Sequence, residues 1–207
     1  MNSIVKKLVL LCGSACVLFS CNTAEKQPVE QKPADAPMSY MDIVRERYSC
    51  RSFDSVQVKR EHLDVILEAG RLAPTAKNLQ EQHVYVCQSP EVLAKIDSLC
   101  PCRYGAPTCL VVTWDATNVF TYPGGKYDSG AEDATIVATH MMLAAKSVGV
   151  ESCWINFFDP DAMRNALNLS KNEKVLMLLP IGYAGKNAAP NQNHFSRKPI
   201  EETVTYK

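Results

Sequence analysis

Two arginines flank a serine at alternating positions in the sequence Arg47-Tyr48-Ser49-Cys50-Arg51. In an extended or turning segment, side chains two residues apart point the same way, so Arg47, Ser49 and Arg51 can converge on one small anion. Arginine offers planar, permanently charged donors that suit phosphate, and serine adds a compact hydroxyl donor. The spacing predicts a phosphate-binding segment, although a solvated charged surface gives the same pattern when the run is taken alone.

Length and charge limit the classes of protein that this sequence can encode. The 207 residues are enough for one domain with a sizeable core, and 46% hydrophobic residues are ordinary for a globular protein. The 22 basic and 22 acidic residues cancel, so the basic surface of a nucleic-acid-binding protein is missing. We therefore expect no nucleic-acid partner.

The N-terminal residues predict export. Two lysines precede an apolar run, Leu8 to Phe19, which is too short for an ordinary transmembrane helix and fits the core of a signal peptide. The run ends at Leu18-Phe19-Ser20-Cys21, which resembles the lipobox of bacterial lipoproteins. The resemblance implies a signal peptide over residues 1–20 and a lipid on Cys21 that anchors the protein in a membrane of the cell envelope. A buried N-terminal helix is the alternative.

A tether and one folded domain follow. Residues 21–38 contain three prolines among mostly polar residues, so we expect them to be disordered. Residues 39–207 form the predicted domain. Within it, Cys100 and Cys102 could oxidise or hold a metal, but no second Cys/His pair with zinc spacing accompanies them. We therefore predict no metal site.

The elements that position the candidate phosphate site alternate between helical and strand-like patterns, which predicts a layered α/β or α+β domain. Helices are expected over residues 40–47, 60–72, 90–99, 130–148 and 160–167. Strands are expected over residues 83–87, 109–113, 152–156, 175–183 and 202–206, with 175–183 in the centre of the sheet. The helix over 130–148 is apolar on nearly all sides, which indicates burial in a core or in an oligomer interface.

Several short motifs occur in a fixed order along this domain, and none is specific by itself. They are Arg47-x-Ser49-x-Arg51, Ala73-Pro74-Thr75-Ala76-x-Asn78-x-Gln80, Leu143-Ala144-Ala145-x-x-x-Gly149, Cys153-Trp154-Ile155-Asn156-x-Phe158, Pro180-Ile181-Gly182-Tyr183 and Arg197-Lys198-Pro199-Ile200. The ordered set resembles the nitroreductase family of FMN-dependent oxidoreductases over residues 40–206. The resemblance implies a three-layer, α/β/α-like α+β sandwich in an intertwined homodimer with FMN in clefts at the interface.

The resemblance also implies which residues bind the cofactor. The arginines and Ser49 would hold the FMN phosphate and ribityl chain, Asn78 would contact the flavin ring with Gln80 close by, and the backbone at 155–157 would face the ring near N5. The implied FMN-binding residues are Arg47, Ser49, Arg51, Asn78, Gln80, Ile155, Asn156, Phe157 and Arg197. One local departure is that Glu81-Gln82 stands where many relatives have Pro-Trp.

The chemistry implied is that of the flavin, and it requires no catalytic side chain. NAD(P)H would reduce FMN, and a nitroaromatic or quinone-like acceptor would then enter the same cleft. Because nicotinamide cofactors are chiefly cytoplasmic, the exported N-terminus leaves another electron donor open. A membrane-tethered FMN-binding protein without nicotinamide-dependent turnover is the alternative function, and a structural lipoprotein without flavin is a further one.

Overall fold

The computed structural model describes residues 38–207. The expected signal peptide, the lipidation site Cys21 and the tether up to residue 37 lie outside the described residues. Among the described residues, no helix combines the length and the apolar character needed to cross a membrane.

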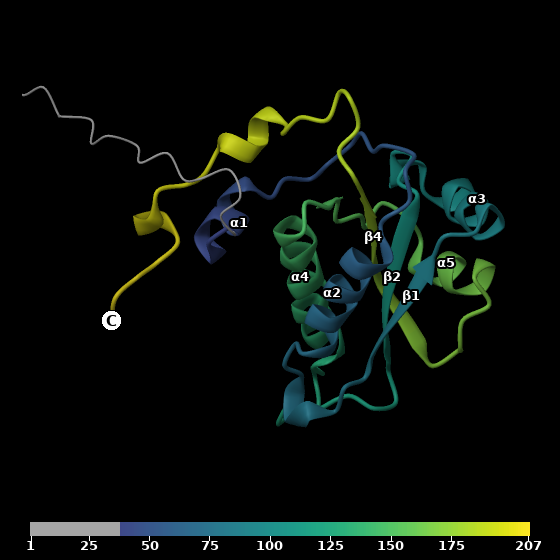
Figure 1. Ribbon diagram of the computed structural model, residues 1–207. Coiled ribbons are helices and arrows are strands. Elements are labelled where there is room, and N and C mark those ends of the chain that lie inside the picture. Colours follow the sequence, from purple (N-terminus) through teal and green to yellow (C-terminus); the bar gives the residue numbers. More distant parts are fainter. Residues whose placement is uncertain (1–37) are drawn as a thin grey trace, which may run out of the picture. The chain divides into compact units, whose positions relative to one another are not determined.

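A four-stranded antiparallel sheet forms the middle layer of the domain (Figure 1). Its strands are β1 (Gln82–Cys87), β2 (Thr108–Asp115), β3 (Glu151–Ser152) and β4 (Glu173–Gly182), in the order β1-β2-β4-β3. The interior strands β2 and β4 are buried over most of their length, as their continuous apolar sequences require of strands covered on both faces. The predicted central strand at 175–183 is therefore confirmed as β4.

Helices cover both faces of this sheet. One face packs against α2 (Arg60–Arg71) and α4 (Gly130–Ser147), and the other packs against α3 (Pro90–Leu99) and α5 (Pro160–Ala166) (Figure 1). Each interface has its own hydrophobic core, with Met141 and Leu110 in the first and Met163 and Val111 in the second. The expected three-layer α/β/α arrangement is confirmed.

Helix α1 (Tyr40–Glu46) begins with a capping box, which the spacing of Ser39 and Asp42 in the sequence favours. The Asp42 backbone N–H donates to Ser39 Oγ at 3.2 Å, and the Ser39 N–H donates to the Asp42 carboxylate at 3.2 Å. No residue of α1 is buried, so the cap and not core packing defines where this helix starts. It ends just before Arg47, which places the arginine–serine segment directly after the helix.

Two predicted strands are corrected by the structure. The strand expected over 152–156 is reduced to β3, after which a single bridge, between Ile155 and Leu178, continues the pairing with β4. The strand expected over 202–206 is wrong: Ile200–Glu202 form a 3-10 turn, and residues 203–207 are exposed. The physical reason is that, within residues 38–207, no strand lies beside this segment to accept its backbone hydrogen bonds.

Gly130, the first residue of α4, touches the Trp114 side chain at the end of β2. A Cβ added at residue 130 would overlap the indole ring. We expect Gly130→Ala to lower the free energy of unfolding by about 3 kcal/mol, because overpacking beside a rigid ring forces the helix off the sheet. Chemical denaturation would measure this loss. The control is Ala131→Gly at the exposed neighbouring position, where a loss of no more than about 1 kcal/mol is expected; equal losses would contradict the predicted overlap.

Candidate functional site

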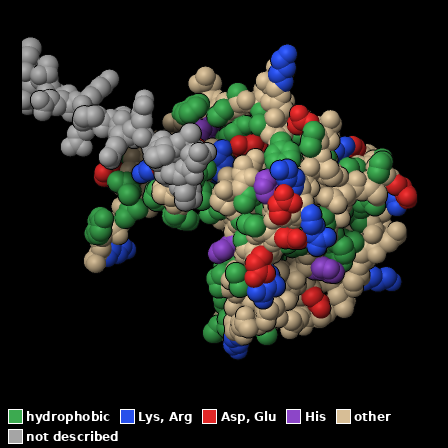
Figure 2. All heavy atoms as spheres, viewed as in Figure 1, with side chains coloured by type: hydrophobic (Ala, Val, Ile, Leu, Met, Phe, Trp, Pro, Cys, Tyr) green, Lys and Arg blue, Asp and Glu red, His purple; other side chains and the backbone are tan. Residues whose placement is uncertain are grey.

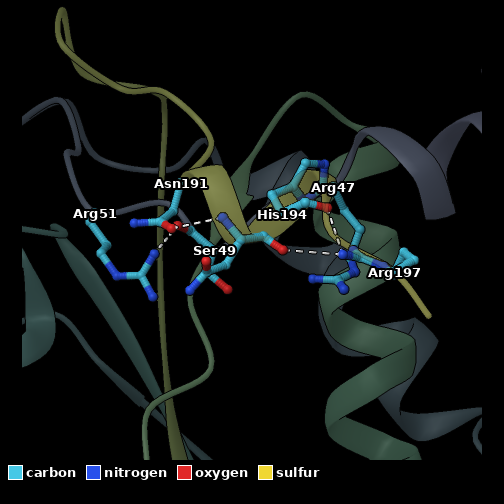
Figure 3. Close-up of a pocket in the computed structure, with 7 residues that line it drawn as sticks. Arg47, Ser49, Arg51, Asn191, His194 and Arg197 are labelled. Atoms are coloured by element: carbon cyan, nitrogen blue, oxygen red, sulfur yellow. Dashed lines mark hydrogen bonds between the residues drawn. The ribbon is translucent and has the colours of Figure 1, made fainter.

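The segment that follows α1 is held in an extended conformation by backbone pairing with β3. Ser49 forms a parallel bridge with Ser152, and the Cys50 N–H donates to the Ser152 carbonyl at 2.9 Å. Side chains two residues apart in this segment point the same way, and Arg47, Ser49 and Arg51 line one cavity (Figure 3). The structure thus brings together the three residues whose spacing predicts phosphate binding.

The opposite wall of the cavity comes from the C-terminal part of the chain. The 3-10 helix η3 (Gln192–Phe195) is capped by the Asn191 carboxamide, which accepts from the Asn193 N–H at 3.0 Å. Asn191, Asn193, His194 and Arg197 line the cavity from this side, and its volume is about 300 Å³ (Figure 3). Arg197, the fourth predicted phosphate ligand, therefore joins the other three.

The cavity carries uncompensated positive charge. Within residues 38–207, none of its three arginines forms an ion pair with a carboxylate. Arg51 donates to the Ser49 carbonyl at 3.1 Å and Arg197 to the carbonyls of His194 and Ser196 at 2.6 and 2.7 Å, which fixes these side chains without neutralising them. Guanidinium groups held in this way are suited to a phosphate group, which accepts several charge-assisted hydrogen bonds at once.

The thiols beside this segment are unsuited to nucleophilic chemistry. Burial raises the pKa of the Cys50 thiol and of the Cys153 thiol, so both remain protonated near neutral pH. All six cysteines of the described part are free. In the same part of the chain, no group of three or more His, Cys, Asp or Glu side chains is arranged to hold a metal ion.

The segment over 153–157 follows the outer edge of β4, starting beside the cavity. The Ile155 N–H donates to the Leu178 carbonyl at 3.0 Å, and the Asn156 carboxamide donates to the Leu176 carbonyl at 2.7 Å. Phe157 lies five residues after Ser152, and these five steps span at most about 17 Å at the rise of an extended chain. A ligand whose anionic end lies in the cavity can therefore extend along Ile155, Asn156 and Phe157.

Asn78 and Gln80 lie elsewhere. Their loop touches the first turn of α4, where the Ala76 N–H donates to Asp133 Oδ1 at 3.0 Å. The cavity residues Arg47 and Ser49 flank Tyr48, whose ring centroid is 5.9 Å from the Lys146 ammonium in the last turn of α4. The 18 residues of α4 separate the two ends by roughly 27 Å. Within one chain, the structure does not bring Asn78 and Gln80 to the cavity.

This loop has an unusual backbone. Lys77, Asn78 and Gln80 all have positive φ values, between 53° and 56°, which non-glycine residues rarely adopt. The loop is closed by the Gln80 N–H, which donates to Thr75 Oγ1 at 3.0 Å. Three such residues within four positions store strain, and strain of this kind is typical of ligand-binding segments.

Three cavity residues were not predicted from the sequence: Asn191, Asn193 and His194. They lie in a stretch for which we predicted no helix or strand, and their only signal was the run of carboxamide and imidazole side chains three to six residues before Arg197. Such polar runs are common in loops. The pairing of this stretch with residues 47–51 exists only in the folded chain.

Comparison with known proteins identifies the family of this architecture. The model of the Nitroreductase family matches residues 44–104 and 101–183, which together are 140 of the 207 residues. The chain is 26% identical over 149 residues to a protein of Archaeoglobus fulgidus provisionally named NADH dehydrogenase/NAD(P)H nitroreductase, covering 69% of this chain and 84% of that protein.

Solved structures share the fold. A nitroreductase family protein from Clostridium difficile 630 is 33% identical, with a TM-score of 0.77 over 82% of this chain and 99% of that one. A provisionally named nitroreductase from Exiguobacterium sibiricum 255-15, solved in complex with FMN, is 23% identical, with a TM-score of 0.71 over 82% of this chain and 98% of that one.

The geometry predicts that inorganic phosphate stabilises the protein through the cavity. At a phosphate concentration of tenfold Kd, binding adds roughly 1.4 kcal/mol, which raises the unfolding temperature by about 3–6 °C. Scanning calorimetry in phosphate and in chloride at equal ionic strength would measure the rise. We expect Arg51→Ala/Arg197→Ala to abolish it, whereas Arg60→Ala, which removes an exposed ion pair on α2, should leave it unchanged. A rise that survives in the double variant would place the anion elsewhere.

Proposed function

The chain belongs to the nitroreductase family, and from this premise we propose that it is an FMN-dependent oxidoreductase that transfers electrons from NAD(P)H to nitroaromatic or quinone-like acceptors. The observation that carries the proposal is the cavity in which three unpaired guanidinium groups surround Ser49. FMN ends in a phosphate, and an unpaired cluster of arginines has a physical use when such a dianion binds to it.

The residues present fit FMN. Arg47, Arg51 and Arg197 offer charged donors to the phosphate, and Ser49 offers a hydroxyl. The segment that follows Ser152, the backbone partner of Ser49, runs along the edge of β4. Within residues 38–207, the backbone N–H groups of Asn156 and Phe157 donate to no protein acceptor, so both are available to the flavin ring. FMN, when bound, supplies the hydride and electron transfer that protein side chains cannot perform.

The chain's own contribution is to bind, orient and shield. The arginine cluster fixes the phosphate end, and the segment from Ile155 to Phe157 fixes the ring end against a sheet that is rigid because both its faces are buried. Phe157 is 74% exposed in the single chain, which leaves an aromatic surface beside the proposed ring position. No side chain near this edge is assigned a proton-transfer role.

We propose that the complete site needs a second copy of the chain. The Asn78 loop and the cavity lie near opposite ends of α4, a helix roughly 27 Å long, so we do not expect one FMN to touch both in the same chain. Residues 185–207 leave the sheet after β4 and run past α1, and they expose Phe195, Ile200 and Tyr206 (Figures 1 and 2). Large exposed apolar side chains on an extended arm favour burial against another subunit.

The expected N-terminal lipid would determine where in the cell the enzyme acts. We propose that Cys21 carries a lipid and that the enzyme is tethered to a membrane of the cell envelope. The tether would leave residues 38–207 in a compartment where nicotinamide nucleotides are scarce. A different electron donor, or an FMN-binding role without nicotinamide-dependent turnover, is therefore the second candidate function.

The visible spectrum of the purified protein tests the flavin proposal. We expect a yellow protein whose absorbance bleaches on anaerobic addition of NADH or NADPH and returns when a nitroaromatic or quinone is added. A yellow protein that responds to neither nucleotide would favour the second candidate function. A colourless protein that cannot be reconstituted with FMN would exclude the flavin altogether.

Co-expression of two defective chains tests the shared site. Arg51→Ala/Arg197→Ala damages the phosphate end, and Asn78→Ala damages the loop at the other end of α4. If each FMN bridges two chains, one of the two sites in every mixed dimer has both halves intact, so the purified mixed dimers should hold about half of the wild-type flavin content. Flavin content after tandem affinity purification measures this recovery. Sites built from one chain alone would show no recovery.

A further inference from the structure

Two buried carboxylates meet beneath the loop that carries Asn78 and Gln80. Glu81 follows this loop, and Asp133 lies in the first turn of α4; each residue is 4% exposed. Neither oxygen of Glu81 has a hydrogen-bond donor, and Asp133 Oδ2 also lacks one, while Asp133 Oδ1 accepts from the Ala76 N–H at 3.0 Å. Three buried carboxylate oxygens without donors are costly unless a proton satisfies them.

The chemistry of this pair favours one shared proton. Two carboxylates in the same buried place cannot both remain ionised at ordinary cost, so the first proton is held strongly. Burial, and then the neighbouring Asp133 carboxylate, raise the pKa of Glu81 from 4.5 to about 7, against a smaller opposing effect of the nearby Ser129 hydroxyl. The protonated Glu81 then has an O–H donor, and the free Oδ2 of Asp133 is an acceptor without another partner.

The other ionisable groups near the pair have partners of their own or lie at the surface. Asp115, at the end of β2, accepts from Thr117, and the Lys77 ammonium lies 4.5 Å from the Phe120 ring centroid. Glu132 is exposed and bonds to Tyr122. Asp128, before α4, accepts from the Gly130 N–H at 3.0 Å. None of these groups is a cation paired with Glu81 or Asp133.

We propose that Glu81 and Asp133 share a single proton, and that this protonated pair positions the loop bearing Asn78 and Gln80 for the flavin. The connection is direct, because the same Asp133 carboxylate that faces Glu81 holds the Ala76 N–H inside the strained loop. Glu81 is a positioning residue, since it acts on the site through Asp133. The part of the inference that concerns the flavin rests on the proposed function; the shared proton does not.

The shared proton has a signature in the stability of the FMN-free protein. Between pH 4.5 and about 7, the native protein keeps this proton and the unfolded chain releases it. The free energy of unfolding therefore falls as the pH rises through this range, and the folding equilibrium constant falls by at most about tenfold for each pH unit. Glu81→Gln supplies a donor that does not titrate, and Asp133→Asn removes the second charge while keeping an oxygen for the Ala76 N–H. Across this pH range, the free energy of unfolding should fall more steeply for the wild type than for either variant. A Glu132→Gln control, which removes an exposed carboxylate in the same helical turn, should follow the wild type.

The loop-positioning step is tested by the affinity for FMN, followed through quenching of flavin fluorescence. Above about pH 7 we expect the wild-type affinity for FMN to fall several-fold relative to that of Glu81→Gln. When both carboxylates are ionised they repel each other, and the displacement of Asp133 disturbs the loop that it holds through the Ala76 N–H. Comparison with this variant cancels the titration of the FMN phosphate, whose second pKa is about 6. Glu81→Leu, which has no donor, should bind FMN more weakly at every pH.

Each result has a separate meaning. Parallel stability profiles for the wild type, Glu81→Gln and Asp133→Asn would overturn the shared proton. Distinct stability profiles with equal FMN affinities in all variants would overturn the positioning role. Distinct stability profiles in a protein that binds no FMN at any pH would support the shared proton and would contradict the proposed function.

Discussion

Three guanidinium groups around one cavity repel one another, and the fold holds them together without a carboxylate to neutralise them. Backbone pairing of residues 49 and 50 with Ser152 fixes two of them, and carbonyl groups of the C-terminal segment fix Arg197. A bound anion, such as the phosphate of the proposed FMN, would offset this electrostatic cost.

Helix α4 determines how the candidate site is divided. Its buried face, including Val137 and Met141, attaches it to the sheet, so its two ends are fixed relative to the strands. The arginine cluster lies at one end and the Asn78 loop at the other. A rigid rod of this length cannot bring its ends together. The proposed dimer removes the conflict because a second chain supplies the missing half.

The Asn78 end of α4 depends on close packing and on buried polar groups. Gly130 allows the helix to begin against Trp114, and Asp133, three residues later, reaches the loop backbone. Glu81 introduces a second carboxylate into this packed region, where it is as deeply buried as Asp133.

The sequence alone determined the elements with strong local signals. The capping box at Ser39, the proline starts of α3 and α5, and the apolar run of β4 each act over a few residues, so their helices and strands could be predicted closely. The alternation of Arg47, Ser49 and Arg51 indicated an anion site for the same reason.

The tertiary structure decided the features that depend on residues far apart in the sequence. It placed Asn191, Asn193 and His194 beside the three arginines of the cavity. It also left residues 203–207 without a strand partner among the described residues, and it buried Glu81 near Asp133. Contacts between residues far apart in the chain leave no periodic pattern in either segment, and only the packed layers bring them together.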